Sequence, residues 1–372
     1  MSDLLKHRYS PAYVARLGAA LTKVWPKFDA AGFQRAVLGG GWSRLELKQR
    51  MRRLSTMLHR FLPLPYPKQI EVLWKVAPSF GGLEGMLFPD FIEQFGLDDF
   101  ETSIGALEYF TQFSSSEFAV RPFLLRYAAR MLRVMRQWAA HKNEHVRRLA
   151  SEGSRPRLPW AMALPAFKKD PSPTLPILAT LRVDPSDYVR RSVANHLNDI
   201  AKDHPELVLE IASRWLKANP ATAGLVKHAC RTLLKRGDSR ALALFGYQRS
   251  ESVDVLGLRL SASTLRLGDD LCFQFVVQHR APAPLPLRLE YAVDFVKADG
   301  KTNRKIFQIS EGLFVPHQPR QFERKHRFRD FTTRHHYDGE HRLSILVNGQ
   351  VTAESSVHLT RAARPRKPND PP

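Results

Sequence analysis

The sequence of 372 residues predicts a mainly α-helical protein, in which a HEAT-like helical repeat solenoid is followed by a C-terminal immunoglobulin-like β-sandwich. Two observations predict this fold class. A charged helical motif recurs after about 40 residues in the first part of the chain, and helical spacing gives way to short alternating runs after Gly246. We therefore expect a repeat domain over residues 1–250, a β domain over 251–360 and a disordered basic tail over 361–372.

Lysine and arginine outnumber the acids by 57 to 36, which gives a formal net charge of +21. Such an excess indicates a polyanionic partner, most simply nucleic acid. The apolar content of 43% suffices for a buried core and excludes a wholly disordered polybasic chain. No apolar run is long enough for a transmembrane helix, and charges near the N-terminus argue against a signal peptide. Two cysteines, Cys230 and Cys272, cannot make a disulfide framework or a zinc site, so we expect a cytoplasmic protein.

The charge changes sign along the chain. Residues 76–120 contain eight acids and neither lysine nor arginine, whereas residues 121–160 contain ten basic residues and two acids. We interpret the second segment as a basic patch with a function rather than an ordinary surface. Arg126, Arg130 and Arg133 fall on one side of an amphipathic helix in this segment. Its core stripe recurs at three- and four-residue spacing and consists of Leu124, Tyr127, Ala128, Met131, Met135 and Trp138.

An internal repeat follows the start of this patch. The motif Glu144–Glu152 aligns with Asp187–Asn195 at an offset of 43 residues, and Leu225–Arg231 is a looser copy. Proline and glycine occur where the helices should begin or end. Stacked helix pairs with this period form a solenoid, whose concave face would gather the equivalent Arg and Lys side chains. HEAT-like arrays also bind proteins, so a basic groove for an acidic peptide is an alternative.

The last part of the chain has the pattern of a β-sandwich. The pairs Asp299-Gly300 and Asn348-Gly349 lie between strand-like runs and predict hairpin turns, because both residue types tolerate positive φ. About a hundred residues with six or seven strands are typical of an immunoglobulin-like domain. The strand-like runs are Leu271–Val277, Leu287–Val296, Ile306–Ile309, Phe322–Phe328, His341–Val347 and Val351–Leu359.

Three segments of the helical part resemble a known family. The runs Tyr188–Glu206, His228–Asp238 and Ala241–Gly246 are similar to the HEAT-like-repeat DNA alkylation repair glycosylases, the AlkC and AlkD proteins. The resemblance covers residues 1–250. The appended β domain and the segment Glu152–Trp160 make the chain similar to AlkC rather than to AlkD.

The resemblance implies a DNA glycosylase of base excision repair. Such enzymes hydrolyse the N-glycosidic bond of cationic alkylated bases, notably 3-methyladenine and 3-methylcytosine, in duplex DNA and without flipping the base. The implied partner is double-stranded DNA that contains alkylated bases, bound by a bacterial, nucleoid-associated monomer without membrane contact. No cofactor and no metal is implied. In AlkC proteins of this type, the immunoglobulin-like domain helps to encircle the duplex.

The chemistry of such lesions predicts the kind of site to look for. An N3-alkylated base is already a cation, so its glycosidic bond breaks with little help from a general acid. A carboxylate near the sugar can stabilise the developing oxocarbenium ion and position a water molecule. An aromatic face can hold the cationic base, and basic side chains must neutralise the flanking phosphates.

Glu152 fits the expected carboxylate. It ends a repeat helix before Gly153 in the basic patch, and Asn195 takes its place in the second repeat, so the scaffold itself does not require an acid there. An acid near a helix C-terminus is also unfavourable with the helix dipole. The alternative is an ordinary surface glutamate paired with a neighbouring arginine. The resemblance to AlkC implies that Glu152, Glu117 and Trp160 are catalytic, whereas the sequence alone also allows Glu117 to be a first-turn acid and Trp160 a core anchor.

We expect DNA contacts from both domains. The loop Phe331–Glu340 is longer than its turn Asp338-Gly339 requires, and we expect Arg334 and His336 in it to contact DNA, although a solvated loop is an alternative. The segment Lys297–Lys305 could add phosphate contacts. In the helical domain, the expected phosphate-binding residues are Arg148, Arg155, Arg157, Arg190, Arg191 and Lys227.

Two other patterns do not support a separate site. Asp199 and Asp203 are four residues apart and could pair as carboxylates, but solvated or fold-specific positions are favoured. His335, His336 and His341 lack a Cys or Asp pattern, so a metal site is rejected.

Two functions from other classes stay open. One is a HEAT scaffold that binds nucleic acid without chemistry, and the other is a protein-binding adaptor. Release of free 3-methyladenine would separate the enzyme from the scaffold, and the adaptor predicts no salt-dependent duplex binding.

Overall fold

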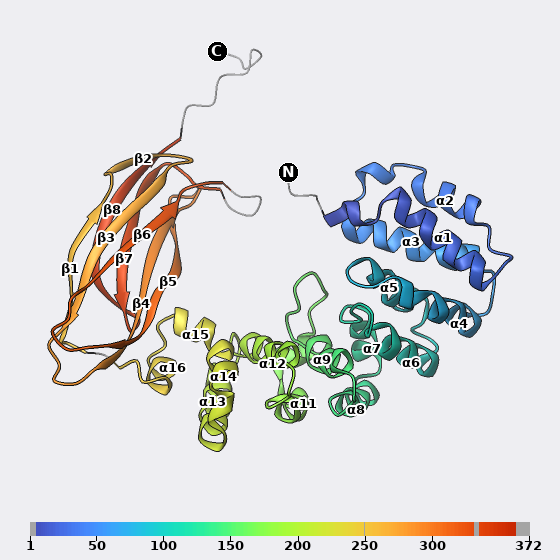
Figure 1. Ribbon diagram of the computed structural model, residues 1–372, viewed down its shortest axis with the longest axis horizontal. Coiled ribbons are helices and arrows are strands. Elements are labelled where there is room, and N and C mark those ends of the chain that lie inside the picture. The colour runs from blue at the N-terminus through green and yellow to red at the C-terminus, as the bar shows by residue number, and fades with distance from the viewer. Residues whose placement is uncertain (1–4, 249, 331–334, 362–372) are drawn as a thin grey trace, which may run out of the picture. The chain divides into compact units, whose positions relative to one another are not determined.

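A computed structural model describes residues 5–248, 250–330 and 335–361 (Figure 1). The chain divides into two compact units, Met1–Ala229 and Cys230–Pro372. The first is helical and the second joins two short helices to a β-sandwich, which confirms the predicted fold class. Across the described part of the chain, no helix has both the length and the apolar character needed to cross a membrane. The expected tail over 361–372 lies, beyond residue 361, outside the described residues.

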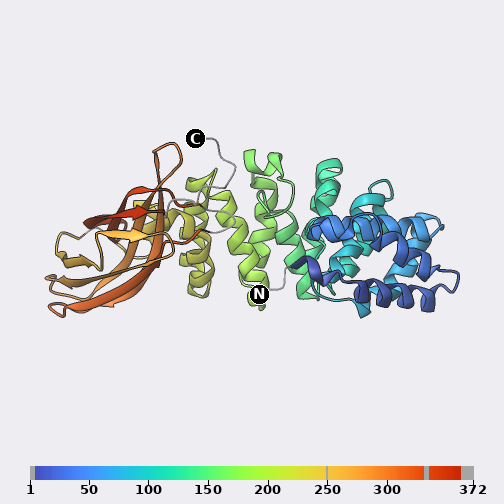
Figure 2. The ribbon, with the colours of Figure 1, turned by 90° about the horizontal axis from the view of Figure 1, so that it is seen from above.

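The first unit is a curved row of helices, in which helices that are close in the chain pack against one another (Figures 1 and 2). Its α-helices are α1 (Pro11–Val24), α2 (Ala30–Leu38), α3 (Leu47–Phe61), α4 (Tyr66–Val76), α5 (Leu87–Phe95), α6 (Phe100–Phe110), α7 (Val120–Arg126), α8 (Ala128–Trp138), α9 (Glu144–Gly153), α10 (Pro165–Lys169), α11 (Leu175–Leu181), α12 (Asp187–Ile200), α13 (Pro205–Ala218) and α14 (Ala223–Ala229). Its 3-10 helices are η1 (Leu5–Arg8), η2 (Trp42–Arg44), η3 (Ala77–Ser79), η4 (Glu84–Met86), η5 (Ser172–Thr174) and η6 (Pro220–Thr222).

The two strongest copies of the sequence repeat form equivalent helices. α9 begins at Glu144 and α12 at Asp187, which are the first residues of the aligned motifs. Before α9, the side chain of Asn143 accepts a hydrogen bond from the backbone N–H of His145 at 2.8 Å, as an N-cap does. The looser third copy falls on α14 and extends past its end at Ala229. Because α12 contacts both α9 and α14, the three copies lie next to one another.

The predicted amphipathic helix of the basic patch is two helices. α7 ends at Arg126 and α8 begins at Ala128, because Tyr127 between them has φ −125° and ψ 40°, outside the helical range. The predicted core stripe is buried at its Leu and Met positions and at Trp138, but Ala128 is exposed. The basic side of the patch is partly neutralised by the acidic segment before it.

Two ion pairs show this neutralisation. Arg126 binds Asp98 at 2.6 Å, and Arg130 forms an ion pair with Glu101. The acidic segment and the basic patch are therefore partners in the fold, and the net charge of the patch overstates what it can offer to a polyanion.

The second unit begins with α15 (Arg231–Lys235) and α16 (Ser239–Leu244) and continues with strands. The six predicted runs lie on β3 to β8, with Phe328 one residue past the end of its strand, whereas the first two strands were not predicted. The strands are β1 (Val253–Leu260), β2 (Thr264–Arg266), β3 (Asp270–His279), β4 (Leu285–Val296), β5 (Thr302–Phe314), β6 (Arg320–Arg327), β7 (Gly339–Val347) and β8 (Gln350–Thr360).

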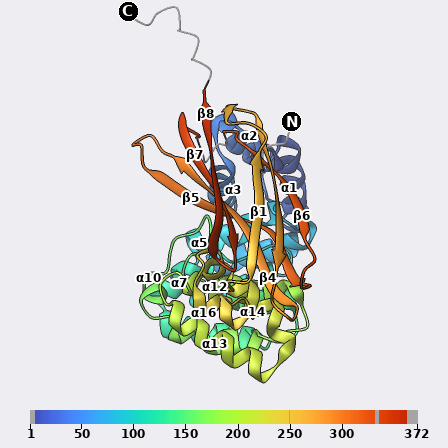
Figure 3. The same ribbon diagram turned by 90° about the vertical axis from the view of Figure 1, so that its left-hand side faces the viewer.

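These strands form two sheets that share one core (Figure 3). One sheet has the order β1-β3-β6 and the other β2-β8-β7-β4-β5. All pairs are antiparallel except β2 with β8. Alternate residues of the strands point into the core, among them Phe273 and Phe275 of β3 and Leu343 and Ile345 of β7.

Both predicted hairpin turns are confirmed. Asp299-Gly300 connects β4 to β5, and Asn348-Gly349 connects β7 to β8. Gly300, Asn348 and Gly349 have φ of 74°, 48° and 80°, the left-handed region that tight hairpin turns require.

α15 and α16 belong with the strands. A Cβ on Gly237, between these helices, would lie 3.2 Å from the carbonyl oxygen of Gly349. The side chain of Asn348 also donates a hydrogen bond to the carbonyl of Gln248 at 2.7 Å. The sequence pattern changes near residue 250, where the strands begin, while the compact units divide earlier, after Ala229.

Candidate active site in the helical unit

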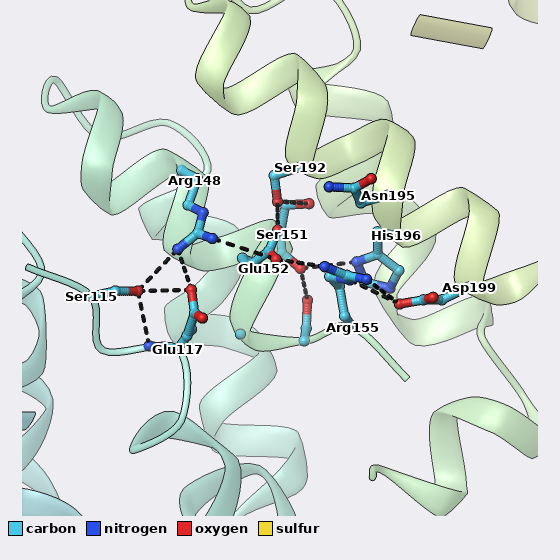
Figure 4. A network of polar contacts seen from close by, with 12 residues as sticks. Ser115, Glu117, Arg148, Ser151, Glu152, Arg155, Ser192, Asn195, His196 and Asp199 are labelled. Carbon is cyan, nitrogen blue, oxygen red and sulfur yellow. Dashed lines mark hydrogen bonds and ion pairs between the residues drawn. The ribbon is translucent and has the colours of Figure 1, made fainter. Parts of the chain in front are cut away.

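Two neighbouring repeat helices supply most polar side chains of the candidate site. α9 carries Arg148 and Glu152, and α12 carries Ser192 and Asp199. Residues three or four positions apart share one face of a helix, and the two faces meet where α9 contacts α12 (Figure 4).

Glu152, the first predicted catalytic carboxylate, is buried among donors (Figure 4). Its Oε1 accepts a hydrogen bond from Nη1 of Arg155 at 2.6 Å and lies 3.4 Å from Nη2 of Arg148. Its Oε2 accepts a hydrogen bond from the hydroxyl of Ser192 at 2.6 Å. Only 5% of the residue is exposed, so the alternative of an ordinary surface glutamate does not fit.

These neighbours keep Glu152 ionised. Burial raises the pKa of Glu152, but the charges of Arg148 and Arg155 and the hydrogen bonds from Ser192 and Arg155 outweigh it and hold the pKa below its usual value of 4.5. The carboxyl group is therefore an anion at neutral pH. It can stabilise a developing positive charge, and it has no proton to donate.

Arg148 joins Glu152 to Glu117, the second predicted acid. Its Nη1 forms an ion pair with Oε2 of Glu117 and donates to the hydroxyl of Ser115 at 2.9 Å. The guanidinium carbon of Arg148 lies 5.1 Å from the ring centroid of Tyr188, which places an aromatic face on the cation. The other oxygen of Glu117, Oε1, forms no hydrogen bond or ion pair with the described residues.

A second ionic branch leads to α12. Nε of Arg155 donates to Oδ2 of Asp199 at 2.8 Å, and Lys202 binds Oδ1 of Asp199 at 3.0 Å. Asp199 is buried, so of the two positions expected from the sequence, solvated or fold-specific, only the second fits it. Asp203 binds Arg157 instead, at 2.6 Å, so the two aspartates do not form a paired site.

Burial also changes the expectation for two arginines. Arg148 and Arg155 were expected at phosphates, but their side chains are only 14% and 8% exposed and both bind carboxylates. Breaking a buried ion pair costs about 3–5 kcal/mol. The expected phosphate contacts of these two residues therefore do not fit the structure, which groups both with the acids.

Trp160 lies in the loop between α9 and α10 with its side chain exposed. The residue is 65% exposed, which excludes the alternative of a core anchor. Its φ of 64° is in the left-handed region, which a bulky residue seldom adopts. The backbone carbonyl of Trp160 accepts a hydrogen bond from Nζ of Lys48 at 2.7 Å. A cavity of about 160 Å³ is lined by Trp160, Glu117, Met51 and neighbouring residues, so the second acid and the exposed indole share one cavity.

Known proteins match both parts of the chain. The family described as DNA alkylation repair enzyme matches residues 108–233, and the C-terminal Ig-like domain of the uncharacterised protein YhaZ matches residues 254–361. The chain is 46% identical to YhaZ of Bacillus subtilis strain 168 over 351 residues, which cover 94% of this chain and 98% of YhaZ. It also matches the structure of Pseudomonas fluorescens alkylpurine DNA glycosylase AlkC bound to DNA containing an abasic site analog. That match has a TM-score of 0.93 and 41% identity and covers 96% of this chain and all of the other.

The chain belongs to the AlkC family of DNA alkylation repair glycosylases. The matched repair segment contains the ionic network from Glu117 to Lys202, because it begins before Glu117 and ends after Lys202. The resemblance found in the sequence is therefore confirmed at the level of the family and the fold.

In this AlkC-family chain, the two arginines of α12 line a second cavity, separate from the one that Glu117 and Trp160 line. Arg190, Arg191 and His228 of α14 line it with Asp187, and its volume is about 380 Å³. Arg190 forms an ion pair with Asp187, whereas Arg191 is exposed. Lys227 is half-buried on α14. Arg191 is thus the one of these three basic residues whose side chain is best presented to a polyanion.

In the β domain, the position of His336 differs from the one expected for a residue that contacts DNA. His336 is 1% exposed, and its ring lies edge-on to Phe295 and Phe328, with centroids 5.1 and 5.8 Å away. A side chain inside the sandwich does not reach a phosphate, so the expected DNA contact of His336 does not fit. Arg334 lies outside the described residues. The segment Lys297–Lys305 spans the β4–β5 hairpin, where its tip is exposed.

Three side chains that contact the acids or the arginine between them were not identified from the sequence. They are Ser115, Tyr188 and Ser192, which contact Arg148 or Glu152. Tyr188 and Ser192 are four residues apart on α12, so the repeat alignment, which makes α12 the neighbour of α9, was a signal that could have found them. Among all the described residues, no three His, Cys, Asp or Glu side chains are grouped as ligands for a metal ion.

Proposed function

We propose that the chain is a DNA glycosylase of base excision repair that hydrolyses the N-glycosidic bond of cationic alkylated bases, 3-methyladenine and 3-methylcytosine, in duplex DNA without flipping the base. One observation carries the proposal. The ionised, buried carboxylate of Glu152 lies in a chain of charge +21 that matches, over nearly its whole length, an AlkC glycosylase whose structure holds DNA with an abasic site analog.

Glu152 has the properties of a charge stabiliser. An N3-alkylated base is positively charged before it leaves, and as the bond to C1′ breaks, the bonding electron pair moves to the base and neutralises it. The sugar becomes an oxocarbenium ion, which an ionised carboxylate stabilises. Because the leaving base needs no proton, the lowered pKa of Glu152 suits this role better than the role of a general acid.

We assign the attacking water to Glu117. Both oxygens of Glu152 accept hydrogen bonds from side chains, whereas Glu117 uses Oε2 for Arg148 and Ser115 and keeps Oε1 without a partner in the described structure. The water oxygen forms the new bond to C1′, and its proton passes to Oε1 of Glu117. The indole of Trp160, which lines the same cavity as Glu117, supplies an aromatic face for the cationic base.

Phosphate binding is the role of side chains away from the acids. We propose that Arg191, together with Arg190, Lys227 and Arg157 of the helical unit, binds the backbone of double-stranded DNA. Arg334 and the hairpin Lys297–Lys305 are proposed to add contacts from the β domain. The proposed enzyme works as a bacterial monomer without a cofactor.

The test is release of the base from a methylated duplex in single-turnover reactions. Wild type should release free 3-methyladenine and 3-methylcytosine, and E152Q and E117Q should each be slower by about 10²-fold or more, because the charge is lost while size is kept. E210Q, which removes an exposed glutamate of α13, is the matched control and should excise like wild type.

Two outcomes would contradict the proposal. Salt-dependent duplex binding by wild type without base release would favour the non-enzymatic scaffold. A strong rise in the fluorescence of 2-aminopurine beside the lesion on binding would show base flipping, which the proposal excludes.

A further inference from the structure

Arg121 of α7 is a buried cation that the proposed reaction does not use. Its residue exposure is 0%, and it is among the largest fully buried side chains. Arginine is almost never fully buried unless it is paired, because the guanidinium group loses its hydration. Arg121 nevertheless forms no ion pair with a carboxylate of the described residues, and its partners are backbone carbonyl groups.

These carbonyl groups lie at the two ends of one loop. Nη1 of Arg121 donates to the carbonyl of Gly153 at 3.0 Å and to that of Arg155 at 2.9 Å. Nε donates to the carbonyl of Met162 at 2.6 Å. Gly153 is the last residue of α9, and Met162 follows Trp160 by two residues. One guanidinium group therefore fastens both the end of the helix that carries Glu152 and the loop that presents Trp160.

The loop that carries Trp160 depends on such hydrogen bonds for its position. Trp160 is mostly exposed and borders a cavity, so close packing of its side chain does not fix its position. Its left-handed backbone is an unfavourable conformation for tryptophan, which persists only where the surroundings impose it. Within the loop, the N–H of Leu164 donates to the carbonyl of Pro156 at 3.1 Å. Lys48 holds the carbonyl of Trp160 from the other side, at 2.7 Å.

The positive charge of Arg121 also interacts with the charges of the acids in the site. Burial lowers the pKa of Arg121 to about 10, and the charge of Arg155 lowers it as well, while Asp199, Glu117 and Glu152 raise it. The side chain is therefore charged at neutral pH. Its Nη2 has no hydrogen-bond partner in the described part of the chain. An apolar side chain would fill this space without that desolvation, so filling space does not account for an arginine here.

We propose that Arg121 is a positioning residue of the excision reaction, which fixes the Glu152 end of α9 and the Trp160 loop in one arrangement. The inference rests on the proposed glycosylase function. Arg121 touches neither substrate nor water in this account and acts only through the backbone of Gly153, Arg155 and Met162. Its loss should therefore lower the rate of the chemical step and leave duplex affinity unchanged.

Two methionine variants separate positioning from stability. R121M removes the three hydrogen bonds to the loop. R50M is the matched control, because Arg50 of α3 is also buried and donates to the carbonyls of Leu45 and Lys6 at 3.1 and 2.9 Å, none of them in the loop. Both variants should unfold at a lower temperature than wild type. Only R121M should lose excision, by about 10²-fold in the single-turnover rate with the duplex Kd unchanged, as expected for a misplaced reacting group.

A conservative variant and a second readout keep the test independent of folding. R121K keeps the charge but has a single donor group, so it should recover part of the rate. Trypsin reports the loop directly, because it cuts after Arg157 only when the loop is released, while Pro156 protects the bond after Arg155. R121M should be cut after Arg157 faster than wild type and R50M.

The outcomes distinguish this inference from the proposed function. If R121M, or R121K where R121M does not fold, excises at the wild-type rate with an equally protected loop, Arg121 is not a positioning residue, although E152Q can still be inactive. If wild type itself releases no base, the proposed function fails, and rapid cleavage after Arg157 in R121M would still support Arg121 as the fastening of the loop.

Discussion

The hydroxyl of Ser192 tests how Glu152 is kept ionised. It is buried and donates to Oε2 of Glu152 at 2.6 Å, while Arg148 and Arg155 approach Oε1. S192A removes one oxygen atom and leaves both ion pairs in place. The variant therefore changes the pKa of Glu152 without adding or removing a charge.

The size of the effect follows from the hydrogen bond. A hydrogen bond to a charged group contributes about 1.5–3 kcal/mol, and 1.36 kcal/mol corresponds to one pKa unit. S192A should therefore shift the acid limb of the excision profile upward by about one to two pH units. Because folding lowers the pKa of Glu152, its ionised form stabilises the fold above the ordinary carboxyl pKa of 4.5, and this contribution is lost as the pH falls through the lowered value. In S192A the loss of rate begins at higher pH, and the stabilisation of the fold by ionised Glu152 at neutral pH is smaller.

The assay is single-turnover excision of 3-methyladenine between pH 5 and pH 8, together with thermal unfolding at each pH. Wild type should have a flat profile in this range, and S192A should lose rate at a higher pH than wild type. His196, whose pKa burial lowers to about 3, does not titrate there. The control is S154A, because the Ser154 hydroxyl is equally buried but donates to the carbonyl of Ala150. An acid limb at the same pH in S192A and in wild type would refute the role of the Ser192 hydroxyl in lowering the pKa of Glu152.

Three further predictions concern DNA contacts. R191A should weaken binding to all sequences alike and flatten the slope of log K against log salt by about one, whereas R214A on α13 should leave the slope unchanged in the same titration. W160A should slow excision roughly 5- to 150-fold, from about 1–3 kcal/mol of stacking, with no change in the free energy of unfolding because the side chain is exposed; a destabilised variant would contradict this placement. Ending the chain after Ser250 should weaken duplex binding and slow excision, and unchanged values of both would remove the β domain from the DNA interface.

The fold was predicted best where the signal is local. The aligned motifs begin α9 and α12 at their first residues, because a helix start depends on a few neighbouring side chains. β1 was missed because Gly257, with φ of 63°, and a register shift between Leu256 and Arg259 interrupt the alternation that identifies a strand. The break at Tyr127 accompanies a long-range contact, in which its hydroxyl donates to the carbonyl of Leu97 at 3.0 Å, and helical spacing carries no sign of such a contact.

In the candidate site, too, the sequence indicated single residues but not their long-range partners. Glu152 and Glu117 could be proposed from residue type and from the resemblance, but their partners could not. Arg148 and Glu117 are 31 residues apart and Arg155 and Asp199 are 44 apart, so each pairing depends on how helices stack. The repeat alignment and the basic patch assigned both arginines to phosphates, because neither pattern tells which cations the fold itself neutralises.

The stacking produces a line of alternating charges. Glu117, Arg148, Glu152, Arg155 and Asp199 follow one another so that each arginine lies between two acids. In an open basic groove these arginines would bind phosphates and leave the acids to repel the DNA backbone. Held between carboxylates and mostly buried, they stay with the acids, and Glu152 stays ionised in a protein of charge +21.

This line has three acids and two arginines, and Lys202 adds a third cation, so the formal charges balance and an oxygen left unpaired in the described part of the chain determines what the site attracts. At one end, Lys202 binds the outer oxygen of Asp199 and neutralises it. At the other end, Oε1 of Glu117 has no partner among the described residues, and Glu117 lines the same cavity as Trp160. A carboxylate with one such unpaired oxygen therefore shares a cavity with the exposed indole. In the proposed reaction, a cationic base gains from the carboxylate and from the cation–π contact, while a neutral base gains from neither, so the proposal accounts for a preference for charged lesions by electrostatics without a pocket shaped to one base.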